Sequence, residues 1–261
     1  MGEWLLRTWF RYATRWATLL ALILAGCATP PSDRAQRAAF DETNDPLEPL
    51  NRTIFDFNDK VYSYVLFPVV RGYNDLPAPA RSGIHNVIGN LREPVVFMNK
   101  TLQGDVSAAS TTAARFAVNT ILGVGGLIDV ASHNDLQEPN GGDFGTTLYG
   151  YGIDEGPYLV LPLLGPSSPR DALGSAVDGV ANPWGYVLYT TYPERLIVSF
   201  GSAVDGFSSR VDDYEQAKKT SLDFYAYLRS AFRQNRRFDL GQAPNADDSL
   251  YDVAPANKDH P

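Results

Sequence analysis

The stretch DPLEPLNRTIFDFNDKVYSYVL, residues 45–66, predicts the first helix of a mainly helical protein. Asp45 precedes a first-turn proline and Glu48 follows three residues later, which is the pattern of a capped helix start. Because Pro49 comes next, we expect regular helix only from about Asn51. Apolar residues then recur at helical spacing along one face, at Ile54, Phe57, Val61 and Val65, and Phe55, Tyr62 and Leu66 widen that face.

Outward from this helix, the helical spacing continues with frequent breaks. The apolar stripe from Ile84 to Leu91 should end at Pro94, because proline pushes the residue before it out of helical geometry. A short helix over residues 95–103 would follow, closed by Gly104. Asp105 can cap the next helix, which carries mostly small residues on one side and ends at a group of glycines, Gly123, Gly125 and Gly126.

The last strong helix is expected from about Val211 to Arg233, with Leu222 on its apolar face and basic residues toward its C-terminus, where the helix dipole favours them. Only residues 158–161 have the character of a short strand. The predicted fold class is therefore mainly α.

The segment FGTTLYGYGIDEGPYLVLPLLGPSSP, residues 144–169, breaks this helical pattern with glycines. Glycine permits turns and close backbone approach. Two interpretations stay open: a glycine-rich loop packed on a core, or a hairpin beside a binding site with Gly150 and Gly152 as hinges. The candidate hinge or channel residues are Gly123, Gly125, Gly126, Gly150, Gly152 and Gly156.

The beginning of the chain has the pattern of a secretory signal peptide over residues 1–26. Three arginines precede a short apolar core, and small residues lead to Cys27. That core is about half of the roughly 20 apolar residues that a membrane-spanning helix needs. Cys27 is the only cysteine, so it can form neither a disulfide nor a thiolate metal site within one chain. An ordinary signal peptide with an incidental cysteine is the alternative interpretation.

Leu24-Ala25-Gly26-Cys27 resembles the bacterial lipobox, which implies cleavage before Cys27 and acylation of its sulfur and its new amino group. Within that class, Ala28 implies the outer membrane. Residues 27–44 would then be a lipidated flexible tether, residues 45–240 a helical domain, and residues 241–261, rich in Asp, Asn, Ala and Pro, a disordered tail.

Charge excludes one class of partner. The chain has a net charge of −8, and residues 1–26 carry a net +2, which leaves −10 after cleavage. Binding to nucleic acid needs a basic surface that neutralises phosphates, so we expect no nucleic-acid partner.

Enzyme motifs are missing from the sequence. It has no G-x-S-x-G, no H-E-x-x-H, no phosphate-binding loop and no dinucleotide fingerprint. His85 is expected to be a surface or satisfied residue, and His260 lies in the tail. Neither His85 nor His133 is expected to be needed for activity. Three acidic residues of the glycine-rich region could supply a carboxylate pair, but solvated loop charges are the favoured interpretation: Asp143, Asp154 and Glu155. The sequence predicts no enzyme, no metal site and no cofactor.

Five stretches resemble the MlaA (VacJ) outer-membrane lipoproteins: residues 45–58, 90–105, 115–131, 144–171 and 225–237. They span nearly all of the predicted domain in the expected order, and Pro49, where the family would have a glycine, is the main departure.

The resemblance implies a ring of helices lying within the outer membrane around an amphipathic channel. It also implies that misplaced phospholipids are removed from the outer leaflet and passed to a soluble periplasmic carrier, and that the protein associates with a trimeric porin. The alternatives are a structural lipoprotein that braces porins and an unrecognised lipid-modifying enzyme.

Overall fold

The computed structural model describes residues 45–188 and 191–241. The predicted signal peptide, Cys27, the tether and the tail beyond Gly241 lie outside these residues. The helices are α3 (Glu48–Val61), the π-helical turn η1 (Tyr62–Leu66), α4 (Phe67–Asn74), α5 (Ala78–Leu102), α6 (Val106–Ile121), the 3-10 turn η2 (Ser132–Asn134), α7 (Phe144–Gly150), α8 (Pro169–Ala181), α9 (Trp184–Val187), α10 (Tyr192–Ser208), α11 (Val211–Thr220) and α12 (Phe224–Asp239). The prediction of a mainly helical fold is confirmed.

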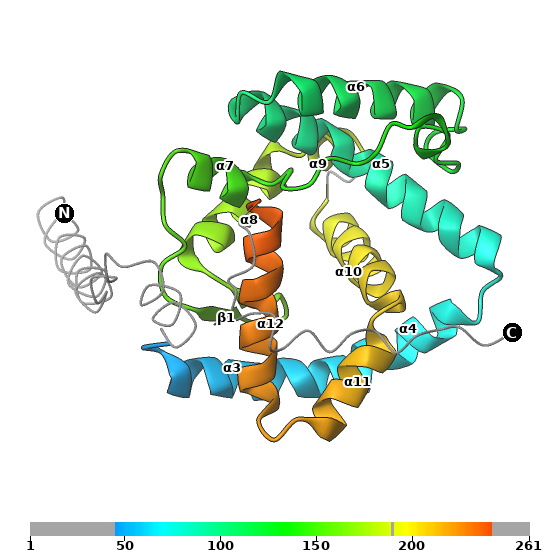
Figure 1. The fold of residues 1–261 in the computed structure, drawn as a ribbon. Coiled ribbons are helices and arrows are strands. Elements are labelled where there is room, and N and C mark those ends of the chain that lie inside the picture. The colour runs from blue at the N-terminus through cyan, green and yellow to red at the C-terminus, as the bar shows by residue number, and fades with distance from the viewer. Residues whose placement is uncertain (1–44, 189–190, 242–261) are drawn as a thin grey trace, which may run out of the picture.

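The helices follow one another around a ring (Figure 1). In the view shown, α3 and α4 form the lower side and α5 rises on the right to pack against α6 at the top. On the left, α7 and α8 pack together, and α12 runs upward from beside α3 to reach them (Figure 1). Helix α10 lies inside this circuit, against α4 and α5.

The start of α3 differs from the prediction. The helix begins at Glu48 with Pro49 in its first turn, where the missing N–H of a proline would have no helical partner anyway. Asp45 does not cap the helix. Its carboxylate accepts hydrogen bonds from the Asn51 side chain at 2.7 Å, from Arg229 at 3.0 Å and from the Tyr225 hydroxyl. The first described residue is therefore tied to α12.

The predicted helix break at Pro94 is wrong. Helix α5 continues through Pro94 to Leu102. It packs along α6, and next to the proline the buried Glu93 accepts a 2.8 Å hydrogen bond from the buried Arg115 of α6. Tertiary packing of this kind overrides the local cost of a proline inside a helix.

The predicted helix from 211 to 233 is two helices. Helix α11 ends at Thr220, and the Asp223 side chain caps α12 by accepting from the Ala226 N–H at 3.1 Å. Leu222 lies in the connection and is fully exposed, so it is not part of an apolar face. The predicted cap at Asp105 is confirmed, since its carboxylate accepts from the Ala108 N–H at 2.9 Å.

The core consists of two clusters. One joins η1 and α4 to α10 and α11, through Tyr62, Leu66, Phe67, Val70, Val204 and Val211. The other joins the only described strands to α12 through Tyr158, Val160 and Tyr225. These strands, β1 (Leu159–Leu161) and β2 (Gly165–Ser167), form an antiparallel hairpin in which Leu159 faces Ser167. The predicted strand character near residue 160 is confirmed.

Candidate functional site

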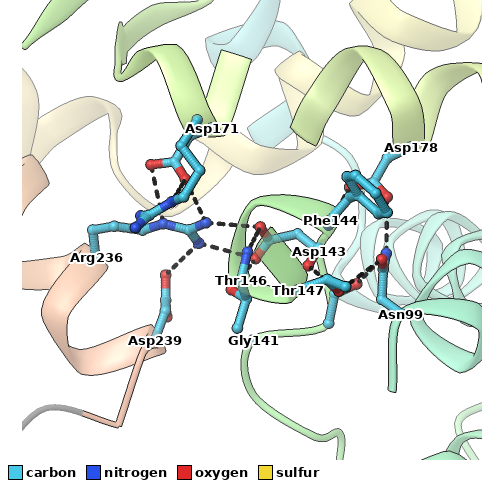
Figure 2. Close-up of polar contacts among 12 residues, drawn as sticks. Asn99, Gly141, Asp143, Phe144, Thr146, Thr147, Asp171, Asp178, Arg236 and Asp239 are labelled. Carbon is cyan, nitrogen blue, oxygen red and sulfur yellow. Dashed lines mark hydrogen bonds and ion pairs between the residues drawn. The ribbon is translucent and has the colours of Figure 1, made fainter. Parts of the chain in front are cut away.

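Helix α12 is joined to α7 and α8 by one buried guanidinium, shown in Figure 2. Arg236 donates to Asp143 at 2.8 and 2.9 Å and to Asp171 at 2.7 and 3.1 Å. Asp239, one turn further along α12, lies 3.9 Å away. Asp143 is the N-cap of α7 and Asp171 lies in the first turn of α8, so Arg236 bridges two helix starts. We call this cluster the α12 joint.

The charges of the α12 joint shift the pKa values of Asp143 and Arg236. Burial alone would raise the pKa of Asp143, but the hydrogen bonds and charge of Arg236, together with the Thr146 contacts, outweigh it and lower the pKa from 3.8 to about 2. Burial opposes the charged form of Arg236, yet its two carboxylate partners raise its pKa above the ordinary value. Asp143 and Arg236 are therefore both charged at neutral pH.

A second set of hydrogen bonds, centred on Asn99 and Asp178, connects α7 to α5 and α8. The Asn99 side chain of α5, which is fully buried, donates to Asp178 of α8 at 2.8 Å and accepts from the Thr147 hydroxyl of α7 at 3.0 Å. The second Asp178 oxygen accepts from the Phe144 N–H at 3.0 Å. Helix α7 is thus held by side chains from α5, α8 and α12.

Close backbone packing completes the joint. A Cβ atom on Gly174 of α8 would lie 2.4 Å from the Gly145 nitrogen of α7. A Cβ atom on Gly145 would lie 2.6 Å from Arg236 Nη2 and from Asp171 Oδ1. Both positions therefore require glycine because a neighbouring helix or ion pair occupies the space of a side chain.

The hairpin is fixed to α3 by two buried asparagines. Asn51 donates to the Tyr158 carbonyl at 3.0 Å and accepts from the Val160 N–H at 2.9 Å. Two helical turns later, Asn58 donates to the Leu161 carbonyl at 2.8 Å and accepts from the Leu163 N–H at 2.7 Å. Each amide thus completes the hydrogen bonds of one strand edge.

The candidate hinges of the glycine-rich segment lie between α7 and the β1–β2 hairpin, the two parts of the segment that other helices fix. Gly150 is the last residue of α7, and Gly152 follows with a φ of 84°, where a side chain would be strained. Gly156 also has a positive φ, of 76°. The segment therefore combines the two predicted forms, a packed segment and a hairpin with candidate glycine hinges. Helix α7 and the β1–β2 hairpin are each fixed by side chains of other helices, and Gly150, Gly152 and Gly156 lie between them.

The other candidate glycines form the tight turn after α6. A Cβ atom on Gly123 would lie 2.2 Å from the Ile128 carbonyl oxygen, and one on Gly126 would lie 2.7 Å from Asn90 Cβ. Gly125 has a φ of 71°. These three glycines serve a close turn against α5.

An apolar groove lies between α4, the start of α5 and α10. Its volume is about 850 Å³, within the range of roughly 300–1,000 Å³ found for small-molecule sites. Val69 and Tyr73 of α4, Ile84 of α5 and an apolar face of α10 (Leu196, Ile197, Phe200, Val204) line it. We call it the α10 groove.

Large apolar side chains are also exposed elsewhere. They gather at the end of α6 and in the turn that follows, at Ile121, Leu122, Val124, Leu127 and Ile128. Exposed apolar clusters of this kind mark surfaces that contact lipid or another protein. None of the helices within residues 45–188 and 191–241 combines the length and the apolar character that crossing a membrane requires.

The histidines and the carboxylates of the glycine-rich region have partners. His85 contacts Asp205 at 2.8 Å, and His133 contacts the Asp129 carbonyl at 2.7 Å. The expectation of solvated loop charges is wrong for Asp143, which pairs with Arg236, and for Glu155, which lies 3.5 Å from the buried Arg233. In the part of the chain that the structure describes, no group of three His, Cys, Asp or Glu side chains is placed to hold a metal ion.

We did not predict a role for Arg236, Asp171, Asp205 or Arg81 from the sequence. One available signal was the spacing of Arg229, Arg233 and Arg236, which places three arginines on one face of a helix together with Tyr225 and Phe232. We interpreted this basic group as favouring the helix C-terminus, whereas the structure buries Arg233 and Arg236.

These features define a class of protein: a ring of helices closed by buried ion pairs, with an apolar groove on an inner helix and exposed apolar turns. The model of the MlaA lipoprotein family matches residues 43–239. The chain belongs to this family.

Two relatives and one solved structure extend the match. The intermembrane phospholipid transport system lipoprotein MlaA of Haemophilus influenzae is 36% identical over 250 residues, which cover 90% of this chain and 94% of the relative. The protein of that name from Escherichia coli is 37% identical over 223 residues, covering 83% and 84%. A chain solved in work on the structural basis for maintenance of bacterial outer membrane lipid asymmetry is 37% identical with a TM-score of 0.64, covering 75% of this chain and 98% of the solved one.

Proposed function

We propose that this protein removes misplaced phospholipids from the outer leaflet of the outer membrane as part of an intermembrane phospholipid transport system. The protein would maintain lipid asymmetry by passing each lipid along the helical ring toward the periplasm. Two relatives bear the name of such a system, and the similar solved structure concerns outer-membrane lipid asymmetry.

The α10 groove is the observation that carries this proposal. Moving a phospholipid out of a bilayer exposes its acyl chains to water, at a cost of about 0.8 kcal/mol for each CH₂ group. An apolar groove inside the helical ring offers the chains a path that avoids this cost. No covalent bond breaks in such a transfer, so the proposed activity requires no cofactor and no catalytic residue.

The location and partners follow from the same proposal. Acylation of Cys27 would anchor the protein to the outer membrane, with the ring facing the periplasm and its exposed apolar turns, such as residues 121–128, in contact with lipid. A trimeric porin and a soluble periplasmic lipid carrier are the partners that the family resemblance implies. The carrier would receive the phospholipid and deliver it to the inner membrane.

Transfer of labelled phospholipid tests the function directly. Vesicles with and without the lipidated protein are mixed with the purified carrier of the same system, and labelled lipid on the carrier is measured. We expect transfer to depend on this protein and the phospholipid to emerge chemically unchanged. Absence of transfer would favour a structural lipoprotein, and a cleaved lipid product would favour a lipid-modifying enzyme.

The anchor has its own test. Cys27→Ser should leave an uncleaved or soluble form that does not restore lipid asymmetry in cells lacking the native protein. The readout is outer-leaflet phospholipid, with membrane fractionation beside it. Full function with normal outer-membrane location of the variant would contradict the lipobox interpretation.

A further inference from the structure

A polar cluster adjoins the α10 groove at Tyr73. Tyr73, which lines the groove, donates its hydroxyl to Asp205 Oδ1 at 2.9 Å. The other oxygen of Asp205 contacts His85 Nδ1 at 2.8 Å. Asp205 is buried, whereas the His85 side chain is 73% exposed. Because Nδ1 faces the carboxylate, the ring is held with Nε2 directed away from Asp205.

Arg81 lies next to this cluster, and among the described residues it has no acidic partner. It precedes His85 by one turn of α5, so both side chains are on the same side of the helix. Ile84, between them in sequence, lines the groove. Arg81 Nε is buried without a hydrogen-bond partner, and Nη1 has a single 3.5 Å contact with Asn74.

No carboxylate of residues 45–188 or 191–241 lies within ion-pair distance of this guanidinium, which is half-buried. An arginine donor that is buried and unpaired is costly unless a ligand satisfies it.

We propose that Arg81 and His85 bind the phosphate of a phospholipid while its acyl chains lie in the α10 groove. The inference rests on the proposed function and assigns the headgroup contact within it. The planar guanidinium of Arg81 matches two phosphate oxygens. When both ring nitrogens of His85 carry a proton, Nδ1 donates to Asp205 and the outward Nε2 can donate to the phosphate. Asp205 acts as a positioning residue, because its two oxygens are occupied by Tyr73 and His85.

Two other roles explain less of the cluster. A purely structural tie between α4, α5 and α10 would account for Tyr73, His85 and Asp205 but leaves the donors of Arg81 unused. The His85–Asp205 pair could also be half of a hydrolytic triad. Within the described residues, however, the contact with Asp205 is the hydrogen bond that His85 makes, and no serine or threonine hydroxyl is bonded to it.

The test compares a lipid that carries a phosphate with one that does not. The full-length lipidated protein in neutral detergent is titrated with phosphatidylglycerol and with diacylglycerol of the same acyl chains, and glycerol phosphate serves as the probe without chains. The wild type should prefer phosphatidylglycerol. Arg81→Gln with His85→Gln should weaken phosphatidylglycerol binding about tenfold or more, the effect of losing charge-assisted hydrogen bonds, and leave diacylglycerol binding unchanged.

Matched controls are available in the chain. Arg92→Gln with His133→Gln removes the same residue types at exposed positions outside the groove and should change neither affinity. Arg81→Lys keeps the charge but loses the planar fork, so an intermediate loss is expected. It also provides a milder variant should the double glutamine variant fold poorly.

The outcomes separate this inference from the proposed function. Equal preference for phosphatidylglycerol in the wild type and the double variant would overturn the headgroup assignment alone. Glycerol phosphate competing as strongly as phosphatidylglycerol would make the cluster a site for free phosphate and overturn it too. A wild type that binds neither lipid would contradict the proposed function itself.

Discussion

The two arginines Arg236 and Arg81 mark two differently built sides of the ring. Arg236, at the α12 joint, has two carboxylates within 3.1 Å and a third at 3.9 Å. Within the part of the chain that the structure describes, Arg81, beside the α10 groove, has a buried Nε without a partner and a single 3.5 Å contact with an amide. One guanidinium is used to close the ring, whereas the other retains donors that a ligand could use.

Glycine packing follows the same division. At the α12 joint, Gly145 and Gly174 bring two helices together so closely that a Cβ atom would clash. Gly201, which lines the α10 groove, has nothing within 4 Å of an added Cβ. The joint is thus tightly packed and fully paired, and the groove has free space and free donors, as a structural contact and a binding surface respectively require.

Removing the charge of Arg236 should have the largest effect on stability. Arg236→Met leaves the partly buried Asp171 and the more exposed Asp143 without their cation. Breaking a fully buried pair costs about 3–5 kcal/mol, and we expect a loss at the lower end of this range because water reaches Asp143. Denaturant unfolding of the purified protein in detergent measures the change. Arg81→Met is the matched control. It strands no carboxylate and should change the unfolding free energy by less than about 1 kcal/mol. An equal loss of unfolding free energy in the two variants would contradict the distinction between a structural Arg236 and an Arg81 that is free to bind a ligand.

The difference between the two glycine positions predicts that alanine destabilises the protein at Gly174 and stabilises it at Gly201. Gly174→Ala must move α8 away from α7, because its Cβ would lie 2.4 Å from a backbone nitrogen, and overpacking of this kind costs about 1–3 kcal/mol. Gly201→Ala, in the middle of α10, meets open space and should stabilise its helix by up to about 1 kcal/mol. Thermal unfolding of both variants measures the difference. A stabilised Gly174→Ala protein would show that the two helices are not in close contact.

Acid should weaken the α12 joint through Asp143. Its pKa is lowered in the folded protein, so its contribution to stability is complete above the unfolded value of 3.8 and is lost as the pH falls toward about 2. The raised pKa of Asp239, caused by burial, acts in the opposite direction. We therefore expect the stability difference between the wild type and Asp143→Asn to shrink between about pH 4 and pH 2. A difference that stays constant over this range would exclude the charged contact.

Features of the fold that depend on neighbouring residues could be predicted from the sequence, and features that depend on contacts between distant residues could not. Local signals succeeded: the Asp105 cap, the glycines after α6 and the strand near residue 160 are all present. Predictions failed where a distant partner decides. Pro94 does not break α5, because α6 packs alongside and pairs Arg115 with Glu93.

The same reason explains the candidate site. Asp143 reads as a loop charge because its partner, Arg236, is far along the chain. The ring-like arrangement was expected from the family resemblance, because helical periodicity indicates which residues are buried but not which helix covers them. The unpaired state of Arg81 could not be predicted at all, since it depends on which carboxylates the fold keeps away from it.

The smallest expected effect concerns the glycines between the two fixed parts of the glycine-rich segment. Helix α7 is held by Asn99 and Arg236, and the hairpin by Asn51 and Asn58, so a movement between them must occur near Gly150, Gly152 and Gly156. A side chain at the positive φ of Gly152 costs about 1–2 kcal/mol, whereas Gly150 is helical and open.

Gly150→Ala with Gly152→Ala should therefore leave the protein level and outer-membrane location near normal but impair lipid removal, with the effect carried by Gly152. Outer-leaflet phospholipid and protein level are measured in the double variant, and Gly150→Ala alone is the control. Normal lipid asymmetry in the double variant would remove the hinge hypothesis. A collapse in protein level would instead favour the interpretation of a loop that is packed for stability. The whole glycine-rich segment would then be a rigid structural element, like the α12 joint.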